Sequence, residues 1–318
     1  MAGEFSLKKI IHISFILIGI LTIMIIFSGC SKETIDTSKF NIVTSFYPMY
    51  VATANIVDGV EDVELRNLTA STTGCLHDYQ LTTSNMVTLS TADVLIVNGG
   101  GMENFIEKAV ETYEDLKVIN ASDEIIHEHE EEEIEHNDEG ELEHTHEHGE
   151  NAHIWVSISM HIEQIKKIRD ELVKIDSKNA EAYIENANHY ILKLEDLKAR
   201  MHQSLDNIEN KKIVTFHEAF EFFAEEFALE IVAVIEREPG TYPSAGEVAN
   251  IIDLIRSKEV KAIFVEPQYS RSAADTIARE TGVSVYTLDP IVTGELDKDS
   301  YIELMNRNLE VLEEALNH

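Results

Sequence analysis

Basic residues are scarce in this chain. Lysine and arginine total 25 against 59 aspartates and glutamates, which gives a formal net charge of −34 over 318 residues. A surface that grips nucleic acid through its phosphates needs the opposite balance of charge. The composition therefore excludes a general nucleic-acid-binding surface and favours the attraction of cations.

The chain has two cysteines, and the first, Cys30, comes at the end of an apolar leader. Lys8 and Lys9 precede an apolar run over residues 10–27, and a Ser-Gly pair then comes directly before Cys30. This pattern resembles a bacterial lipoprotein signal peptide, so we expect residues 1–29 to be removed and Cys30 to be lipidated. An uncleaved membrane anchor is the alternative, since the run approaches the length that spans a bilayer. Both interpretations predict export of the rest of the chain.

A lipidated Cys30 would leave Cys75 as the one remaining thiol. A disulfide within the chain is then excluded. We expect residues 30–39 to form a short polar tether and Cys75 to be a small buried thiol. A role for Cys75 as a metal ligand is the alternative, because it lies two residues before His77.

One segment is rich in histidine and has no basic residue. Between Asp123 and Glu150, six histidines lie among fourteen acidic residues. Neutral imidazole beside carboxylate suits divalent zinc, and a histidine-rich tract is a compositional metal signal. Few apolar side chains are present to fix its shape, so we expect a disordered loop over residues 122–151. Its histidines are candidates for weak accessory metal binding: His127, His129, His136, His144, His146 and His148.

Apolar runs alternate with helical patterns at both ends of the chain. This alternation predicts parallel sheets covered on both faces, in two Rossmann-like α/β lobes. In the first lobe the expected strands are 40–46, 63–68, 93–98 and 117–120, with helices near 48–57, 83–91 and 103–113. In the second they are 212–216, 230–235, 262–265 and 284–288, with helices near 218–227, 244–258, 270–281 and 299–316.

The middle of the chain predicts one long helix. Apolar residues recur there at spacings of three and four from Tyr183 to Ile208, which is a single stripe over about seven turns. A stiff helix of this length would join the lobes and oppose large domain closure. We therefore expect an N-terminal lobe over 40–175, a rigid linking helix over 176–209, and a C-terminal lobe over 210–318.

Four polar residues are expected to meet between the lobes. Ligands of open α/β sheets bind beyond the carboxyl ends of the strands. His217 and Asp289 follow expected strands of the second lobe, while His77 and His153 lie in loops of the first. Three imidazoles and one carboxylate make a suitable tetrahedral shell for zinc. His161, His189 and His202 lie on expected helices without partners at metal-ligand spacing, and we expect them at the surface.

Several segments, in this order, resemble the motifs of the zinc/manganese solute-binding lipoproteins of ABC transporters. The resemblance covers the chain from Asn41 to its end, and it rests on the segments His77–Thr82, Asn151–Ser157, Phe216–Phe220, Pro243–Glu247, Phe264–Gln268 and Thr287–Pro290. The fold that it implies is two α/β lobes bridged by a long helix, with the metal site in the cleft between them.

The resemblance also implies roles for individual residues. His77, His153, His217 and Asp289 match the family's metal ligands. The third of these positions is typically histidine in zinc importers and glutamate in manganese importers, so His217 implies Zn²⁺ rather than Mn²⁺. Ligand softness favours the same metal. We expect Glu266 and Asp78 to lie behind the ligands, where they would hold the imidazoles in orientation or support the fold.

The implied function is that of a monomeric zinc receptor that delivers its metal to an ABC-transporter permease. It would be tethered through Cys30 on the outer face of the cytoplasmic membrane of a Gram-positive cell, or lie in a periplasm. Manganese or another divalent metal is an alternative cargo. A zinc hydrolase is a remote alternative, because four protein ligands leave no open position for water and the sequence has no H-E-x-x-H motif.

The first prediction separates the folded site from the histidine-rich tract. Replacing His217 by alanine should lower zinc affinity far more than deleting residues 124–149, because scattered residues of the folded lobes make the tight site. Calorimetric titration of both variants with Zn²⁺ measures this difference. Equal losses of affinity would move the primary site into the tract.

Overall fold

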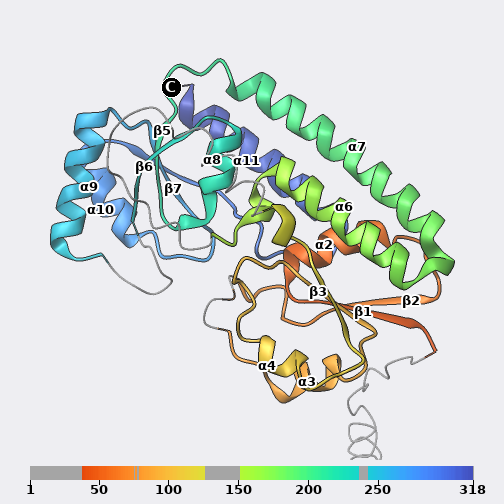
Figure 1. Ribbon diagram of the computed structural model, residues 1–318. Coiled ribbons are helices and arrows are strands. Elements are labelled where there is room, and N and C mark those ends of the chain that lie inside the picture. The colour runs from red at the N-terminus through yellow and green to blue at the C-terminus, as the bar shows by residue number, and fades with distance from the viewer. Residues whose placement is uncertain (1–37, 75, 77–78, 126–150, 236–242, 318) are drawn as a thin grey trace, which may run out of the picture. The chain divides into compact units, whose positions relative to one another are not determined.

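Two parallel sheets form the framework of the chain (Figure 1). The computed structural model describes residues 38–317, apart from 75, 77, 78, 126–150 and 236–242. The first sheet has the order β2-β1-β3-β4 and the second β6-β5-β7-β8, and every pairing in both is parallel. The strands are β1 (Phe40–Thr44), β2 (Val63–Asn67), β3 (Val94–Val97), β4 (Lys117–Asn120), β5 (Lys212–Thr215), β6 (Glu230–Val234), β7 (Ala262–Val265) and β8 (Ser284–Thr287). The predicted fold class is confirmed.

The helices of the second lobe end within one residue of their predicted ends and begin one to three residues after their predicted starts. They are α8 (Glu221–Glu226), α9 (Ala245–Lys258), α10 (Ser272–Thr281) and α11 (Ser300–Leu316), with the short helix η3 (Glu218–Phe220) before α8. Ser244 and Glu247 form a reciprocal capping box at the start of α9. Gly282 ends α10 in the left-handed region, with φ of 80°.

The first lobe departs from prediction after β3. Its helices are α2 (Tyr47–Ile56), α3 (Thr83–Leu89) and the single turn α4 (Glu107–Val110), where a helix over 103–113 was expected. The reason is Glu103, whose buried carboxylate accepts hydrogen bonds from the backbone N–H groups of Asn98 and Gly99 and from the Ser45 hydroxyl. The loop curls around this carboxylate through the positive φ angles of Gly99, Gly100 and Gly101.

A layer of long helices joins the two lobes. The helices α6 (Ile158–Ile175) and α7 (Ala180–Leu205) are linked by the short turn η2 (Ser177–Asn179) and pack against each other. In addition, α7 contacts α2 of the first lobe and α11 of the second, so it lies along both (Figure 1). The predicted apolar stripe is buried from Tyr183 to Leu205. The linking element is therefore a helical hairpin, of which the expected helix is the second half.

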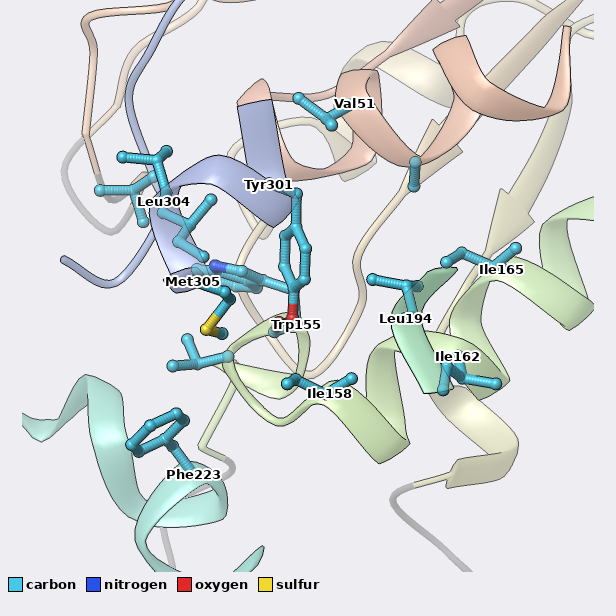
Figure 2. Close-up of a cluster of buried hydrophobic side chains, with 14 of the residues drawn as sticks. Val51, Trp155, Ile158, Ile162, Ile165, Leu194, Phe223, Tyr301, Leu304 and Met305 are labelled. Carbon is cyan, nitrogen blue, oxygen red and sulfur yellow. Dashed lines mark hydrogen bonds between the residues drawn. The ribbon is translucent and has the colours of Figure 1, made fainter. Parts of the chain in front are cut away.

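One buried hydrophobic cluster continues through both lobes. It includes Ile42 of β1, Leu194 of α7, Phe223 of α8 and Leu312 of α11. Figure 2 shows its centre, where Trp155 lies beside Tyr301 and Met305. Smaller clusters cover the other faces of the two sheets. The described residues from 38 to 317 accordingly belong to a single compact unit.

The predicted leader over 1–29 and the tether over 30–39 lie outside the described residues, except for Ser38 and Lys39. Within the described part of the chain, no helix has both the length and the apolar character needed to cross a bilayer.

A carboxylate of the second lobe caps a helix of the first. Glu226, the last residue of α8, accepts hydrogen bonds from the Ser157 hydroxyl at 2.8 Å and from the backbone N–H groups of Ile158 at 2.7 Å and Ser159 at 3.0 Å. The first N–H groups of a helix have no partner within the helix, and a negative charge there is favourable. Glu226 thus ties the start of α6 to α8.

Replacing Glu226 by alanine should lower the free energy of unfolding by about 1–3 kcal/mol, because these donors lose a charged acceptor. Urea unfolding measures the loss. The matched control is Glu314→Ala, an exposed glutamate of α11, which should change stability by less than about 0.5 kcal/mol. Equal effects of the two substitutions would show that the cap contributes no stability.

Candidate metal site

Three predicted site residues follow neighbouring strands of the second sheet. Glu266 comes directly after β7, while His217 and Asp289 lie two residues beyond the ends of β5 and β8. These strands are adjacent in the order β5-β7-β8, and parallel strands end at one edge of a sheet. The sheet therefore carries an imidazole and two carboxylates along the edge where α/β proteins bind ligands.

His153 approaches the same edge from the first lobe. It directly precedes the short helix η1 (Ile154–Val156), and its ring lies edge-on to that of His217, with ring centroids 5.1 Å apart and an interplanar angle of 83°. Each of the two histidines is only 3% exposed. The fold thus brings two predicted ligands from different lobes into ring contact in a buried position.

The loop before His153 is fixed by hydrogen bonds on both sides. The Asn151 side-chain oxygen accepts from the His153 backbone N–H at 3.0 Å and lies 2.9 Å from His153 Nδ1. The Asn98 side-chain amide donates to the backbone carbonyl of Ala152 at 2.8 Å. These contacts set both the backbone and the ring of His153.

Trp155, the middle residue of η1, anchors this short helix in the second lobe. Its indole N–H donates to the Pro290 carbonyl at 2.7 Å, and its own carbonyl accepts from the Tyr301 hydroxyl at 2.8 Å. Its ring is edge-on to Phe46, at 5.0 Å. Since Pro290 directly follows Asp289, the indole hydrogen bond links the His153 segment to the Asp289 segment.

Asp289 is held in a tight turn. One carboxylate oxygen accepts from the Ile291 backbone N–H at 2.8 Å, and the side chain of Asn308 hydrogen-bonds both the N–H and the carbonyl of Asp289. Burial raises the pKa of Asp289, while the hydrogen bond from Ile291 and the nearby Arg307 act in the opposite direction.

Glu266 is the more deeply buried carboxyl group. It is 2% exposed, and within the described residues its Oε1 has no hydrogen-bond partner. Burial, and then the charge of Asp289, raise the pKa of Glu266 to about 8. Two carboxyl groups that resist ionisation thus lie along the same sheet edge as His217, and a divalent cation near them would favour their ionised forms.

The remaining predicted site residues fall outside the described part of the chain. These are His77, Asp78, Cys75 and Cys30, together with the six histidines of the tract. Among the residues that are described, no group of three or more His, Cys, Asp or Glu side chains is gathered closely enough to hold a metal ion. The ligand set of His77, His153, His217 and Asp289 therefore stays a prediction, of which the structure brings the His153–His217 pair together.

The prediction that His161 lies at the surface is wrong. His161 is fully buried on α6, where its ring stacks on Tyr301 with centroids 4.3 Å apart. Its Nδ1 lies 3.1 Å from the Gln164 side-chain oxygen, and burial lowers the pKa of His161 to about 4. It is a neutral core residue. His189 is exposed and His202 half-exposed beside Asp206, as expected.

The roles of Asn151, Asn98 and Glu226, which position the His153 segment, are not evident from the sequence. Asn151 begins the segment Asn151–Ser157 that resembles a family motif, but its position there does not reveal its contacts. The contacts of Asn98 and Glu226 join residues 54 or more positions apart in the chain, and no local pattern marks such pairs.

Fold and site together define a class. The chain is an α/β protein of two parallel-sheet lobes that collects imidazole and carboxylate groups at the carboxyl ends of its strands.

Comparison with known proteins then gives the family. Residues 42–315 match the family described as zinc-uptake complex component A, periplasmic, and the chain belongs to it. It is 34% identical over 306 residues to the high-affinity zinc uptake system protein ZnuA of Bacillus subtilis, covering 91% of this chain and 92% of that protein. This confirms the resemblance drawn from the motifs.

A second relative and a solved structure are also similar to this chain. The chain is 30% identical over 300 residues to the zinc-binding lipoprotein AdcA of Streptococcus pneumoniae, covering 90% of this chain but 58% of that longer protein. Its structure matches that of the SBP FpvC of Pseudomonas aeruginosa in complex with Mn²⁺, with a TM-score of 0.74 and 30% identity, over 88% of this chain and 98% of that one.

The pKa of Glu266 leads to a prediction for Glu266→Gln. Between about pH 4.5 and 8 the unfolded chain loses the Glu266 proton before the folded protein does, so this group makes wild-type stability fall as the pH rises. Glutamine carries no such proton. The stability of the variant relative to wild type should therefore increase with pH in this window, by at most about 1.4 kcal/mol per pH unit, and level off above it.

Urea unfolding of both proteins at several pH values, with chelator present, measures this difference. The control Glu310→Gln replaces an exposed glutamate of α11, and its difference from wild type should stay flat. A flat difference for Glu266→Gln as well would contradict the raised pKa.

Proposed function

We propose that this chain is an extracytoplasmic receptor that captures Zn²⁺ and delivers it to the permease of an ABC transporter. Membership of the zinc-uptake component A family supports this proposal. The observation that carries it is the buried His153–His217 pair, which two separate lobes contribute at the sheet edge where Glu266 and Asp289 also follow their strands. Imidazole and carboxylate are both ligands that zinc binds in proteins.

Zinc is the preferred cargo because the contacting pair is entirely imidazole. Manganese favours oxygen ligands, whereas imidazole suits zinc, copper, iron and nickel. The relatives from Bacillus subtilis and Streptococcus pneumoniae are named for zinc, while the similar FpvC structure contains Mn²⁺. Manganese is therefore the second candidate cargo for this chain.

The complete site in this proposal adds His77 to His153, His217 and Asp289. Glu266 would act from behind them. Its carboxyl group lies beside Asp289, whose charge helps to raise the Glu266 pKa, and a nearby cation would reverse that effect by favouring the ionised forms. The six histidines of the tract would bind zinc weakly and raise its concentration near the site.

Tethering through Cys30 is the proposed means of keeping a monomeric receptor at the outer face of the cytoplasmic membrane. The lipoprotein name of the AdcA relative supports this part of the proposal. The arrangement would hold captured zinc within reach of the permease.

A binding protein fits these residues better than an enzyme. A zinc hydrolase needs a metal-bound water and a general base beside it. The proposed ligands His77, His153, His217 and Asp289 would fill the four positions of tetrahedral zinc and leave none for that water.

Substitution of His153 tests the proposal. His153→Ala should weaken zinc binding by more than about 100-fold, since even residues that only support a ligand are typically worth 10- to 100-fold in metal affinity. His189→Ala, on the exposed face of α7, is the control and should bind like wild type. Competition titrations with a chromophoric chelator measure both, and repeating them with Mn²⁺ tests the choice of metal.

Unchanged zinc affinity of His153→Ala would remove this histidine from the site. Tighter binding of Mn²⁺ than Zn²⁺ by the wild type would establish the second cargo. Zinc-dependent hydrolysis of ester or peptide substrates, abolished by chelator, would overturn the receptor function.

A further inference from the structure

The amide of Asn151 links the two segments that carry the histidines of the candidate site. Its oxygen faces His153, as described above. Its nitrogen donates to the Glu218 backbone carbonyl at 3.2 Å and to the Glu221 carboxylate at 2.7 Å. Glu218 is the residue after His217, so this one side chain contacts both histidine segments.

These partners fix which way the amide points. The oxygen and nitrogen of an asparagine are told apart by their hydrogen-bond partners. The backbone N–H of His153 can only donate, so it requires the oxygen, whereas the Glu218 carbonyl and the Glu221 carboxylate can only accept and require the nitrogen. A flipped amide would lose all three hydrogen bonds.

The orientation of the amide determines where His153 carries its proton. The Asn151 oxygen lies 2.9 Å from Nδ1 of the ring, and an oxygen acceptor at that distance requires an N–H group on Nδ1. A neutral imidazole has only one such proton, so its lone pair is then on Nε2. A metal ion binds imidazole through that lone pair.

We propose that Asn151 is a positioning residue that holds His153 in the Nδ1–H tautomer, with Nε2 as the metal-binding nitrogen. Histidines that bind metals are commonly fixed in this way by an oxygen acceptor on their other nitrogen. The additional feature here is the link to Glu218 and Glu221. The same amide that sets the tautomer of His153 also holds the segment that carries His217 against it, so it governs the geometry of the pair.

The experiment combines tautomer and affinity measurements, since the inference rests on the proposed function. In the metal-free full chain labelled with ¹⁵N-histidine, long-range ¹H–¹⁵N correlation spectra distinguish the two neutral tautomers, and a His153→Ala spectrum identifies the His153 signals. The wild type should show Nδ1–H. Asn151→Ala should lose this preference and weaken Zn²⁺ binding by about 10- to 100-fold.

Asn151→Asp separates the two roles of the amide. It keeps an oxygen acceptor for His153 but cannot donate to Glu221, so it should retain the Nδ1–H tautomer and bind Zn²⁺ more tightly than the alanine variant. It also provides the test should the alanine variant fail to fold. Asn104→Ala, an exposed asparagine of the same lobe, is the control and should match wild type in both measurements.

Each remaining outcome is decisive. An Nε2–H tautomer in the wild type, or an unchanged tautomer in Asn151→Ala, would overturn the inference even if affinity fell, because that pattern would indicate a purely structural role. A wild type with the Nδ1–H tautomer that binds no zinc would overturn the proposed function and leave the assignment of the tautomer to Asn151 standing.

Discussion

The hydrogen bond from the Trp155 indole to the Pro290 carbonyl is the contact on which the site depends. It joins the two lobes within the buried cluster. The Tyr301 hydroxyl of α11 adds a second hydrogen bond by donating to the Trp155 carbonyl. His153 lies two residues before Trp155, and Asp289 directly precedes Pro290. Separating the two segments would leave the buried indole N–H without an acceptor, which costs more free energy than an ordinary hydrogen bond contributes. The hydrogen bond therefore fixes the position of the His153 segment relative to the Asp289 segment.

The helical hairpin of α6 and α7 opposes movement of one lobe relative to the other. The helix α7 contacts α6, α2 and α11, and its apolar stripe lies entirely within the shared core. Relative movement of the lobes would therefore expose apolar surface along the whole stripe rather than bend a loop. The start of α6 is held separately by Glu226. This framework suits a protein in which local groups adjust around a cargo and the lobes stay in place.

Much of the fold could be predicted because its signals are local. Because ligand-binding residues follow the carboxyl ends of parallel strands, the sequence alone predicts that His217, Glu266 and Asp289 lie along one edge of the sheet, as they do. The burial of His161 could not be predicted in this way. It depends on Gln164, which hydrogen-bonds the distant Asn98 and Ser122, and on Tyr301 from the other end of the chain. A histidine on a polar-looking helix gives no sign of such a pocket.

The expected helix over 103–113 is wrong for a related reason. Its first residue, Glu103, uses its carboxylate to accept hydrogen bonds from the backbone of the preceding turn, so the helix begins only at Glu107. The predictions for the leader, the tether, His77 and the histidine tract concern residues that the structure does not describe, and they stay predictions.

The cap that Glu226 provides has a consequence for binding thermodynamics. Its hydrogen bonds, like those of Asn151, join the His153 and His217 segments through protein atoms alone, so a cation is not needed to form them. The conformational entropy of ordering this half of the site is lost when the chain folds rather than when a cargo arrives. When a cation binds the two imidazoles, little binding free energy is then lost to ordering them, as in other preorganised receptors.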